Sequence, residues 1–307
     1  MATHRLPTTG VRLFFLLMVG ACAATPLTFP AAEEHLVKAE ACVVAGQWDE
    51  VHSLLGDLEQ EACPKRLRDR RDLAAAIAYR GQNELWEAFR LLETFPDLYP
   101  HSDLRPTVVE MVWEIGEALA RSDRGFLFFW SDERAGRTVL EHLITRHPET
   151  PRLADALRIL GDMAFVDTDY ELAQQRYRDL MLNRPESEWF GYAQFRFAMS
   201  IVASLEGPEY DLDRMQLAVR ELKDFLTTKP ENPEIVQTAT AAVAQVLEWQ
   251  IDRHLRIAAF YRRVGNVPGQ LHHLGIATGD EFAATTRHQE AVAARNELRN
   301  ANPGSAP

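Results

Sequence analysis

Residues 154–187 read "ADALRILGDMAFVDTDYELAQQRYRDLMLNRPES" and carry the clearest structural signal of the chain. Its apolar and small residues recur at helical spacing on two faces: Leu157, Leu160, Gly161 and Ala164 on the first, and Tyr170, Ala173, Tyr177 and Leu180 on the second. The short turn "DTD" separates the two faces. Two amphipathic helices of this length cannot bury both faces alone. The stretch therefore predicts a helical hairpin that stacks against neighbouring hairpins.

This 34-residue unit matches the tetratricopeptide pattern, with Pro185 at its closing position. Further segments carry parts of the same pattern, and they are residues 46–64, 85–100, 133–148, 214–230 and 260–282. We therefore expect an all-α fold, a tetratricopeptide-like right-handed superhelix of five to six helical hairpins. The first and last hairpins are expected to be atypical end caps.

Signals that end one helix and begin the next occur four times along the chain. A proline ends the preceding helix because it cannot continue the hydrogen-bond ladder, and these prolines are at positions 100, 148, 185 and 230. Two residues after each proline stands a side chain that suits an N-cap, namely Ser102, Thr150, Ser187 or Asn232. The spacing of these signals exceeds 34 residues, which predicts inserts such as residues 121–134.

The amino-terminal stretch "LFFLLMVGACAATP", residues 13–26, is too short to span a membrane. Arg5 and Arg12 precede it and no acidic residue occurs within 1–21, as in an export signal. The motif "VGAC" (19–22) resembles the bacterial lipobox, which implies cleavage before Cys22 and lipid attachment to it. An ordinary signal peptide with Cys22 near the cut is the alternative. Ala23 after the cysteine resembles the sorting choice for the outer membrane, with the protein facing the periplasm.

The predicted organisation has five parts. They are a lipoprotein signal peptide at 1–21, the lipidated cysteine with an extended tether at 22–32, amino-terminal repeats at 33–187, carboxy-terminal repeats at 188–300, and a disordered tail at 301–307. Pro26 and Pro30 are the reason to expect an extended tether.

Composition and motifs argue against nucleic-acid binding and catalysis. The chain carries 33 Lys and Arg against 45 Asp and Glu, and it repels phosphate backbones. It lacks HExxH, GxSxG, P-loop and CxxC motifs.

His142 and His147 are five residues apart, which places them on different helical faces. Each isolated histidine is expected to be a packing or surface residue. We expect no catalytic residue, no metal and no cofactor, with proteins and a membrane as partners.

Two groups of residues leave alternatives open. Cys42 and Cys63 could pair in an oxidising compartment, but the helical register places them too far apart, so free thiols are favoured.

The segment "GFLFFW" (125–130) is rich in bulky apolar side chains. Packing against the repeats is favoured, and a partner interface is the alternative. Its candidate contact residues are Phe126, Phe128, Phe129 and Trp130.

Residues 90–119, "RLLETFPDLYPHSDLRPTVVEMVWEIGEAL", and 257–267, "IAAFYRRVGNV", together with the lipobox, resemble the BamD family of outer-membrane assembly lipoproteins. The resemblance implies that residues 33–150 receive unfolded β-barrel proteins and that 188–295 dock on the barrel-assembly subunit. The family usually has a basic Lys/Arg-Asp-Arg stretch where this chain has Leu247, Glu248 and Trp249, so its docking ion pair is not carried over. Trp249 is a further candidate interface residue. The alternative is another envelope tetratricopeptide lipoprotein that binds a different protein or a cell-wall component.

Overall fold

The computed structural model describes residues 28–58, 63–122, 125–126, 130–209 and 211–302. The chain divides into two compact units, Met1–Gln82 and Asn83–Pro307. Cys22 and residues 303–307 of the predicted tail lie outside the described residues.

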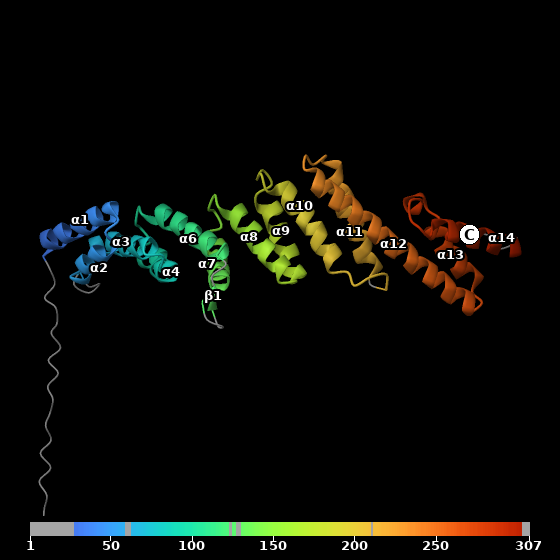
Figure 1. Cartoon of the computed structure of the whole chain (residues 1–307), viewed down its shortest axis with the longest axis horizontal. Coiled ribbons are helices and arrows are strands. Elements are labelled where there is room, and N and C mark those ends of the chain that lie inside the picture. Colours follow the sequence, from blue (N-terminus) through green and yellow to red (C-terminus); the bar gives the residue numbers. More distant parts are fainter. Residues whose placement is uncertain (1–27, 59–62, 123–124, 127–129, 210, 303–307) are drawn as a thin grey trace, which may run out of the picture. The chain divides into compact units, whose positions relative to one another are not determined.

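Unit 1 contains α1 (Phe29–Ala45), α2 (Trp48–Gly56), the short 3-10 helix η1 (Lys65–Leu67) and α3 (Arg68–Gly81) (Figure 1). Gly46 makes the turn between α1 and α2 with a φ of 71°, a backbone conformation that glycine adopts without strain. The Arg70 guanidinium on α3 donates to Glu33 at 2.8 Å and to Glu40 at 2.7 Å on α1. These ion pairs and the buried apolar side chains of α1 and α2 hold the unit together.

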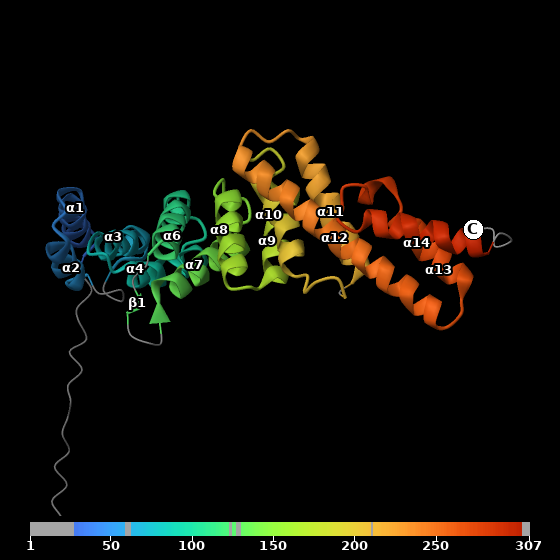
Figure 2. The same cartoon turned by 45° about the vertical axis from the view of Figure 1, so that its right-hand side comes forward.

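Unit 2 contains the remaining elements. They are α4 (Leu85–Leu92), α5 (Phe95–Leu98), α6 (Arg105–Ala120), β1 (Gly125–Phe126), β2 (Trp130–Ser131), α7 (Asp132–Arg146), α8 (Leu153–Val166), α9 (Tyr170–Asn183), α10 (Phe190–Ala203), α11 (Leu212–Thr227), α12 (Pro233–Arg263), α13 (Val267–Ala277), η2 (Asp280–Phe282) and α14 (His288–Ala301). Consecutive helices pack as antiparallel pairs, α6 with α7, α8 with α9, α10 with α11 and α12 with α13 (Figures 1 and 2). The predicted all-α, tetratricopeptide-like class is therefore confirmed.

Glycines set the close approach of the helices within a pair. A Cβ atom on Gly161 of α8 would lie 2.7 Å from the Tyr177 ring of α9. A Cβ atom on Gly136 of α7 would lie 2.4 Å from the backbone nitrogen of Ala120 on α6. Real Cβ atoms do not come this near, so both positions require glycine. The glycine and tyrosine of the predicted repeat pattern are thus a single packing contact.

The four prolines end helices as predicted. Helices α5, α7, α9 and α11 finish two or three residues ahead of Pro100, Pro148, Pro185 and Pro230 respectively. Of the four residues predicted as N-caps, one caps an α-helix directly and three do not. Asn232 caps α12, since its Oδ1 accepts from the amides of Glu234 and Ile235 at 2.9 and 3.3 Å.

Ser102, Thr150 and Ser187 do not cap α-helices directly. Each side-chain oxygen accepts the amide two residues later, at 3.2, 3.3 and 3.2 Å, and the α-helix begins one residue after that amide. The three residues therefore stabilise a tight turn that leads into the helix.

Helix α12 is 31 residues long, about twice the length of its neighbours. No proline or glycine occurs between Pro233 and Gly265, so nothing in this stretch ends the helix. Its amino-terminal half packs on α10 and α11 through Ala239 and Ala242. Its carboxy-terminal half packs on α13 (Figure 2). There the Tyr261 ring lies against Gly269 of α13.

Several elements begin or end at other residues than the sequence suggested. Helix α1 begins at Phe29, because Pro30 is favoured in a first helical turn, so residues 29–32 are helical and not an extended tether. Residue 301 ends α14 and is not part of a disordered tail. The insert at 121–134 contains a two-stranded antiparallel sheet with Phe126 opposite Trp130. Aromatic residues favour strands, which explains this departure from an all-helical chain.

The chain does not divide between residues 187 and 188, where the sequence suggested a boundary. One hydrophobic core runs from Leu153 on α8 to Ala291 on α14. The indole Nε1 of Trp189 also donates to Asp155 Oδ1 at 2.8 Å, so the two predicted halves of the repeats are packed and bonded together. Within the described residues, no helix combines the length and the apolar character needed to cross a membrane.

Candidate protein-binding site

A polar cluster surrounds the Asp162 carboxylate on α8. We call Arg158, Asp162, Tyr177, Tyr192 and Arg196 the Asp162 cluster. The hydroxyls of Tyr177 and Tyr192 both donate to Asp162 Oδ1 at 2.7 Å, and Arg158 Nη1 donates to Oδ2 at 3.2 Å. Arg196 Nε donates to the Tyr177 hydroxyl at 3.2 Å and lies 3.5 Å from Asp162 Oδ1. One carboxylate thus connects α8, α9 and α10.

Aromatic rings hold the two arginines of the Asp162 cluster in place. The Arg158 guanidinium lies 4.3 Å from the centre of the Trp189 ring, and the Arg196 guanidinium lies 3.9 Å from the centre of the Phe165 ring. A cation above an aromatic face is attracted by the quadrupole of the ring. The guanidinium groups are therefore oriented before any ligand arrives.

The Asp162 cluster is only partly covered. The side chains of Arg158, Asp162 and Arg196 are 17, 28 and 20 % exposed, whereas Tyr177 is fully buried. Burial and then the hydrogen bond to Asp162 raise the pKa of Tyr192 to about 12. Burial and then the charge of Asp162 raise the pKa of Tyr177 still further. Both hydroxyls consequently remain protonated donors at neutral pH.

One donor of the Asp162 cluster is unused. The Arg158 Nε atom is buried and has no hydrogen-bond partner among the described residues. A buried donor without an acceptor costs free energy, so this atom is a local weakness in the packing of the cluster. The partly exposed side chains of Arg158 and Arg196 are the parts of the cluster that a ligand can reach.

The repeat pattern indicates the packing residues around the cluster but not the cluster itself. Gly161 and Tyr177 are repeat-signature positions, whereas the pattern gives no role to Asp162 or Arg196. The signals available were the helical spacing of four between Arg158 and Asp162, and the aromatic-rich segment "WFGYAQFRF" at 189–197. Neither signal shows from which neighbouring helix a partner side chain will come.

The chemistry of the Asp162 cluster suits recognition of protein surfaces. Arginine, tyrosine and tryptophan are the residues that most often dominate protein interfaces. Both arginines and Trp189 keep part of their surface accessible. In the described part of the chain, no group of three or more His, Cys, Asp and Glu side chains could hold a metal ion.

Only part of the predicted interface lies within the described residues. Phe128 and Phe129 lie outside the described residues, as Cys22 does. The backbones of Phe126 and Trp130 pair in the small sheet. The side chains that would decide between a buried and an exposed insert lie outside the described part. Trp249 is half-buried on α12 and packs against the core of unit 2.

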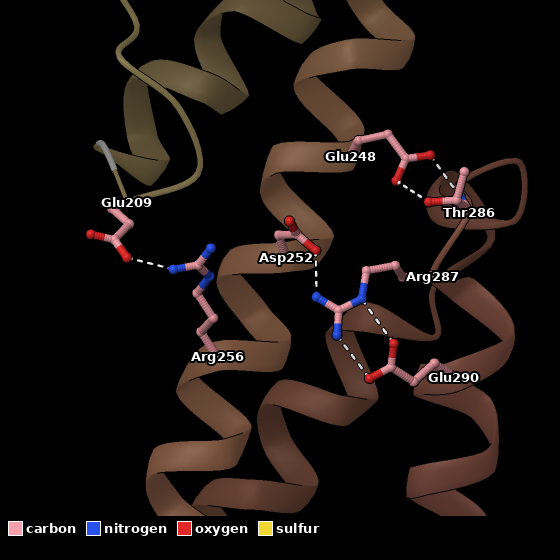
Figure 3. Close-up of polar contacts among 7 residues, drawn as sticks. All are labelled: Glu209, Glu248, Asp252, Arg256, Thr286, Arg287 and Glu290. Carbon is pink, nitrogen blue, oxygen red and sulfur yellow. Dashed lines mark hydrogen bonds and ion pairs between the residues drawn. The ribbon is translucent and has the colours of Figure 1, made fainter.

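The residues around Trp249 are engaged within the chain. The carboxylate of Glu248 accepts from the Thr286 amide at 2.6 Å and from its hydroxyl at 3.0 Å. Asp252 accepts from Arg287 Nη1 at 2.6 Å, and Arg287 also binds Glu290. Figure 3 shows these contacts on one side of α12. This segment therefore fastens the start of α14 to α12.

Two pairs of histidines come together in unit 2. The ring centres of His142 and His147 are 6.1 Å apart, closer than their sequence spacing predicted, because His147 lies beyond the end of α7. Nδ1 of His254 on α12 lies 3.1 Å from Nδ1 of His273 on α13. The predicted packing role holds for His147 and His254, which are both 3 % exposed. Cys42 and Cys63 are both free, as favoured from the sequence.

Among solved structures, this chain is similar to the tetratricopeptide domain of P58(IPK). The match covers 90 % of this chain and 67 % of that domain, with 11 % sequence identity and a TM-score of 0.29. No protein-family model matches the sequence. No curated protein matches it either. The tetratricopeptide-like architecture is given by the paired helices and their glycine contacts.

Proposed function

We propose that this protein is a lipid-anchored scaffold of the bacterial outer membrane, facing the periplasm, that helps assemble or insert β-barrel proteins by binding other proteins. Its partners would be the barrel-assembly subunit and unfolded outer-membrane proteins. The "VGAC" motif and the resemblance to the BamD family support the anchor and the assembly role.

The Asp162 cluster is the observation that carries the binding function. Arg158 over the Trp189 ring and Arg196 over the Phe165 ring form a partly exposed patch of the residue types that anchor protein interfaces. The exposed parts of the Arg158 and Arg196 side chains can donate to a backbone carbonyl or a carboxylate of a partner.

A second candidate is an envelope scaffold with a different protein or cell-wall partner. Glu248 favours it, because this acidic residue stands where the BamD family usually has a basic stretch and is bonded to Thr286 of the same chain. Docking on a barrel-assembly subunit would then have to use other residues.

Affinity capture of the full chain from detergent-solubilised envelopes separates the two candidates. The barrel-assembly subunit is expected in the captured complex, and its absence under mild conditions would disprove the assembly role. Arg158→Met and Trp189→Ala should each reduce the captured partners severalfold. Arg121→Ala, at an exposed position on the end of α6, is the matched control and should capture as much as the wild type.

A further inference from the structure

The carboxy-terminal half of α12 carries an exposed stripe of basic and aromatic side chains. Arg253, Arg256, Phe260 and Arg263 follow one another at spacings of three, four and three residues, which places them on one side of the helix. We call these four residues the Arg256 stripe. Phe260 is 51 % exposed, and the Arg256 side chain is 52 % exposed.

The Arg256 stripe faces away from the contacts that fasten α12 to its neighbours. Figure 3 shows Arg256 and Glu209 on one side of α12, and Asp252 with Arg287 on the other. His254 and Ala258, between the stripe residues in sequence, are buried. The side of α12 that packs on α13 and α14 is thus covered, whereas Arg256 and Phe260 of the stripe are about half exposed.

The positive charge of the stripe contrasts with the rest of the chain. The whole protein has a formal net charge of −12, yet residues 253–263 contain four arginines and no acidic residue. Basic side chains near a helix carboxy-terminus are stabilised by the helix dipole, which accounts for Arg262 and Arg263. The dipole effect fades within the last turn, so it does not account for Arg253 and Arg256.

A groove runs along the stripe. It has a volume of about 690 Å³ and is lined by the stripe residues together with Ile257, Ala259, Arg262 and Glu209. The Glu209 carboxylate accepts from Arg256, so one carboxylate of this chain already occupies the edge of the groove. Arg253, Arg262 and Arg263 make no ion pair or hydrogen bond with another described residue.

We propose that the Arg256 stripe is a docking surface for an acidic amphipathic peptide segment of a partner protein. Carboxylates of the segment pair with the arginines, and an aliphatic or aromatic side chain packs on Phe260 and Ile257. Charge complementarity and the Glu209–Arg256 pair favour a carboxylate-bearing ligand. Because Arg256 already binds a protein carboxylate, that of Glu209, the stripe favours a peptide carboxylate over a lipid headgroup. This surface is separate from the Asp162 cluster, and the inference does not depend on the proposed role in barrel assembly.

The test uses fluorescence anisotropy of a labelled helical peptide. The probe carries glutamates at i, i+3, i+7 and i+10 with leucines beside them, and a second probe has glutamine in place of each glutamate. The full chain should bind the glutamate peptide at least about tenfold more tightly than the glutamine peptide, with affinity falling as salt increases. Phe260→Ala and Arg263→Glu should each weaken binding at least about fivefold.

Matched variants control for general changes in charge and apolar surface. Arg121→Glu removes an exposed arginine on α6, and Leu182→Ala removes a 72 % exposed leucine on α9. Both should bind the peptide as the wild type does. Circular dichroism of all four variants should give the wild-type helix content, since the four altered side chains are exposed.

Three results would overturn the proposal. The first is an absence of binding, or equal binding by the wild type and the two stripe variants. The second is binding to phosphatidylglycerol vesicles that Arg263→Glu abolishes, without peptide binding, which would assign the stripe to a membrane surface. The third is a dimer in sedimentation that Phe260→Ala dissociates, without peptide binding, which would assign it to a second copy of the chain.

Discussion

The Tyr192 hydroxyl on α10 donates a 2.7 Å hydrogen bond to the Asp162 carboxylate on α8, and so links two successive helical pairs. The Tyr177 hydroxyl on α9 donates to the same oxygen atom. The charges of Arg158 and Arg196 offset that of Asp162 in a partly buried setting. The candidate binding surface and the packing of the repeats therefore depend on one side chain.

Replacing Asp162 should destabilise unit 2. Asp162→Ala leaves two tyrosine donors and two arginines without their acceptor, and we expect the free energy of unfolding to fall by about 2–4 kcal/mol. Asp162→Asn keeps an oxygen acceptor and should cost roughly half as much. Urea unfolding followed by tryptophan fluorescence measures both. Equal stability of Asp162→Ala and the wild type would show that the cluster does not hold the helices together.

Filling the space at Gly161 should also destabilise the protein. The added Cβ of Gly161→Ala would lie 2.7 Å from the Tyr177 ring, and overpacking of this kind costs about 1–3 kcal/mol. Gly191→Ala on α10 is the control, because its Cβ meets no atom within 4 Å. That variant should be neutral or more stable by up to about 1 kcal/mol, since alanine favours a helix. Calorimetry that ranked the two variants in the opposite order would contradict this account.

The repeat pattern of residues 154–187 was sufficient to predict α8 and α9, and it included Gly161 and Tyr177 without showing that they touch. These features depend on local helical spacing, which a sequence displays directly. The Asp162 cluster was not predicted, because Arg196 and Tyr192 meet Asp162 only after α10 packs on α8 and α9. The division after Gln82 was missed for a similar reason, since it depends on which helices share a core. The length of α12 could have been predicted from the absence of glycine and proline between Pro233 and Gly265.

The lipid anchor gives a direct prediction about Cys22. In cells labelled with an alkyne fatty acid, the wild-type chain should carry the label, whereas Cys22→Ser should lose it and leave the membrane fraction. Cys42→Ser and Cys63→Ser should retain the label, because half-buried Cys42 and buried Cys63 belong to the folded unit 1. Label on the Cys22→Ser chain, measured by mass spectrometry, would exclude lipidation at this cysteine.

The contact between His254 and His273 should make the protein less stable in acid. Burial, followed by the charges of His273, His272 and Arg253, lowers the pKa of His254 to about 4 from 6.5. A depressed pKa means that the unfolded chain binds the proton more readily, so stability is full above pH 6.5 and falls as the pH drops towards 4. The loss should be at most about 3–4 kcal/mol, at about 1.4 kcal/mol per pKa unit.

Thermal unfolding at several pH values tests this. As the pH falls, the melting temperature should decline less steeply for His254→Leu than for the wild type. Carboxylates titrate alike in both chains, so parallel declines would mean that His254 does not couple the packing of α13 to pH.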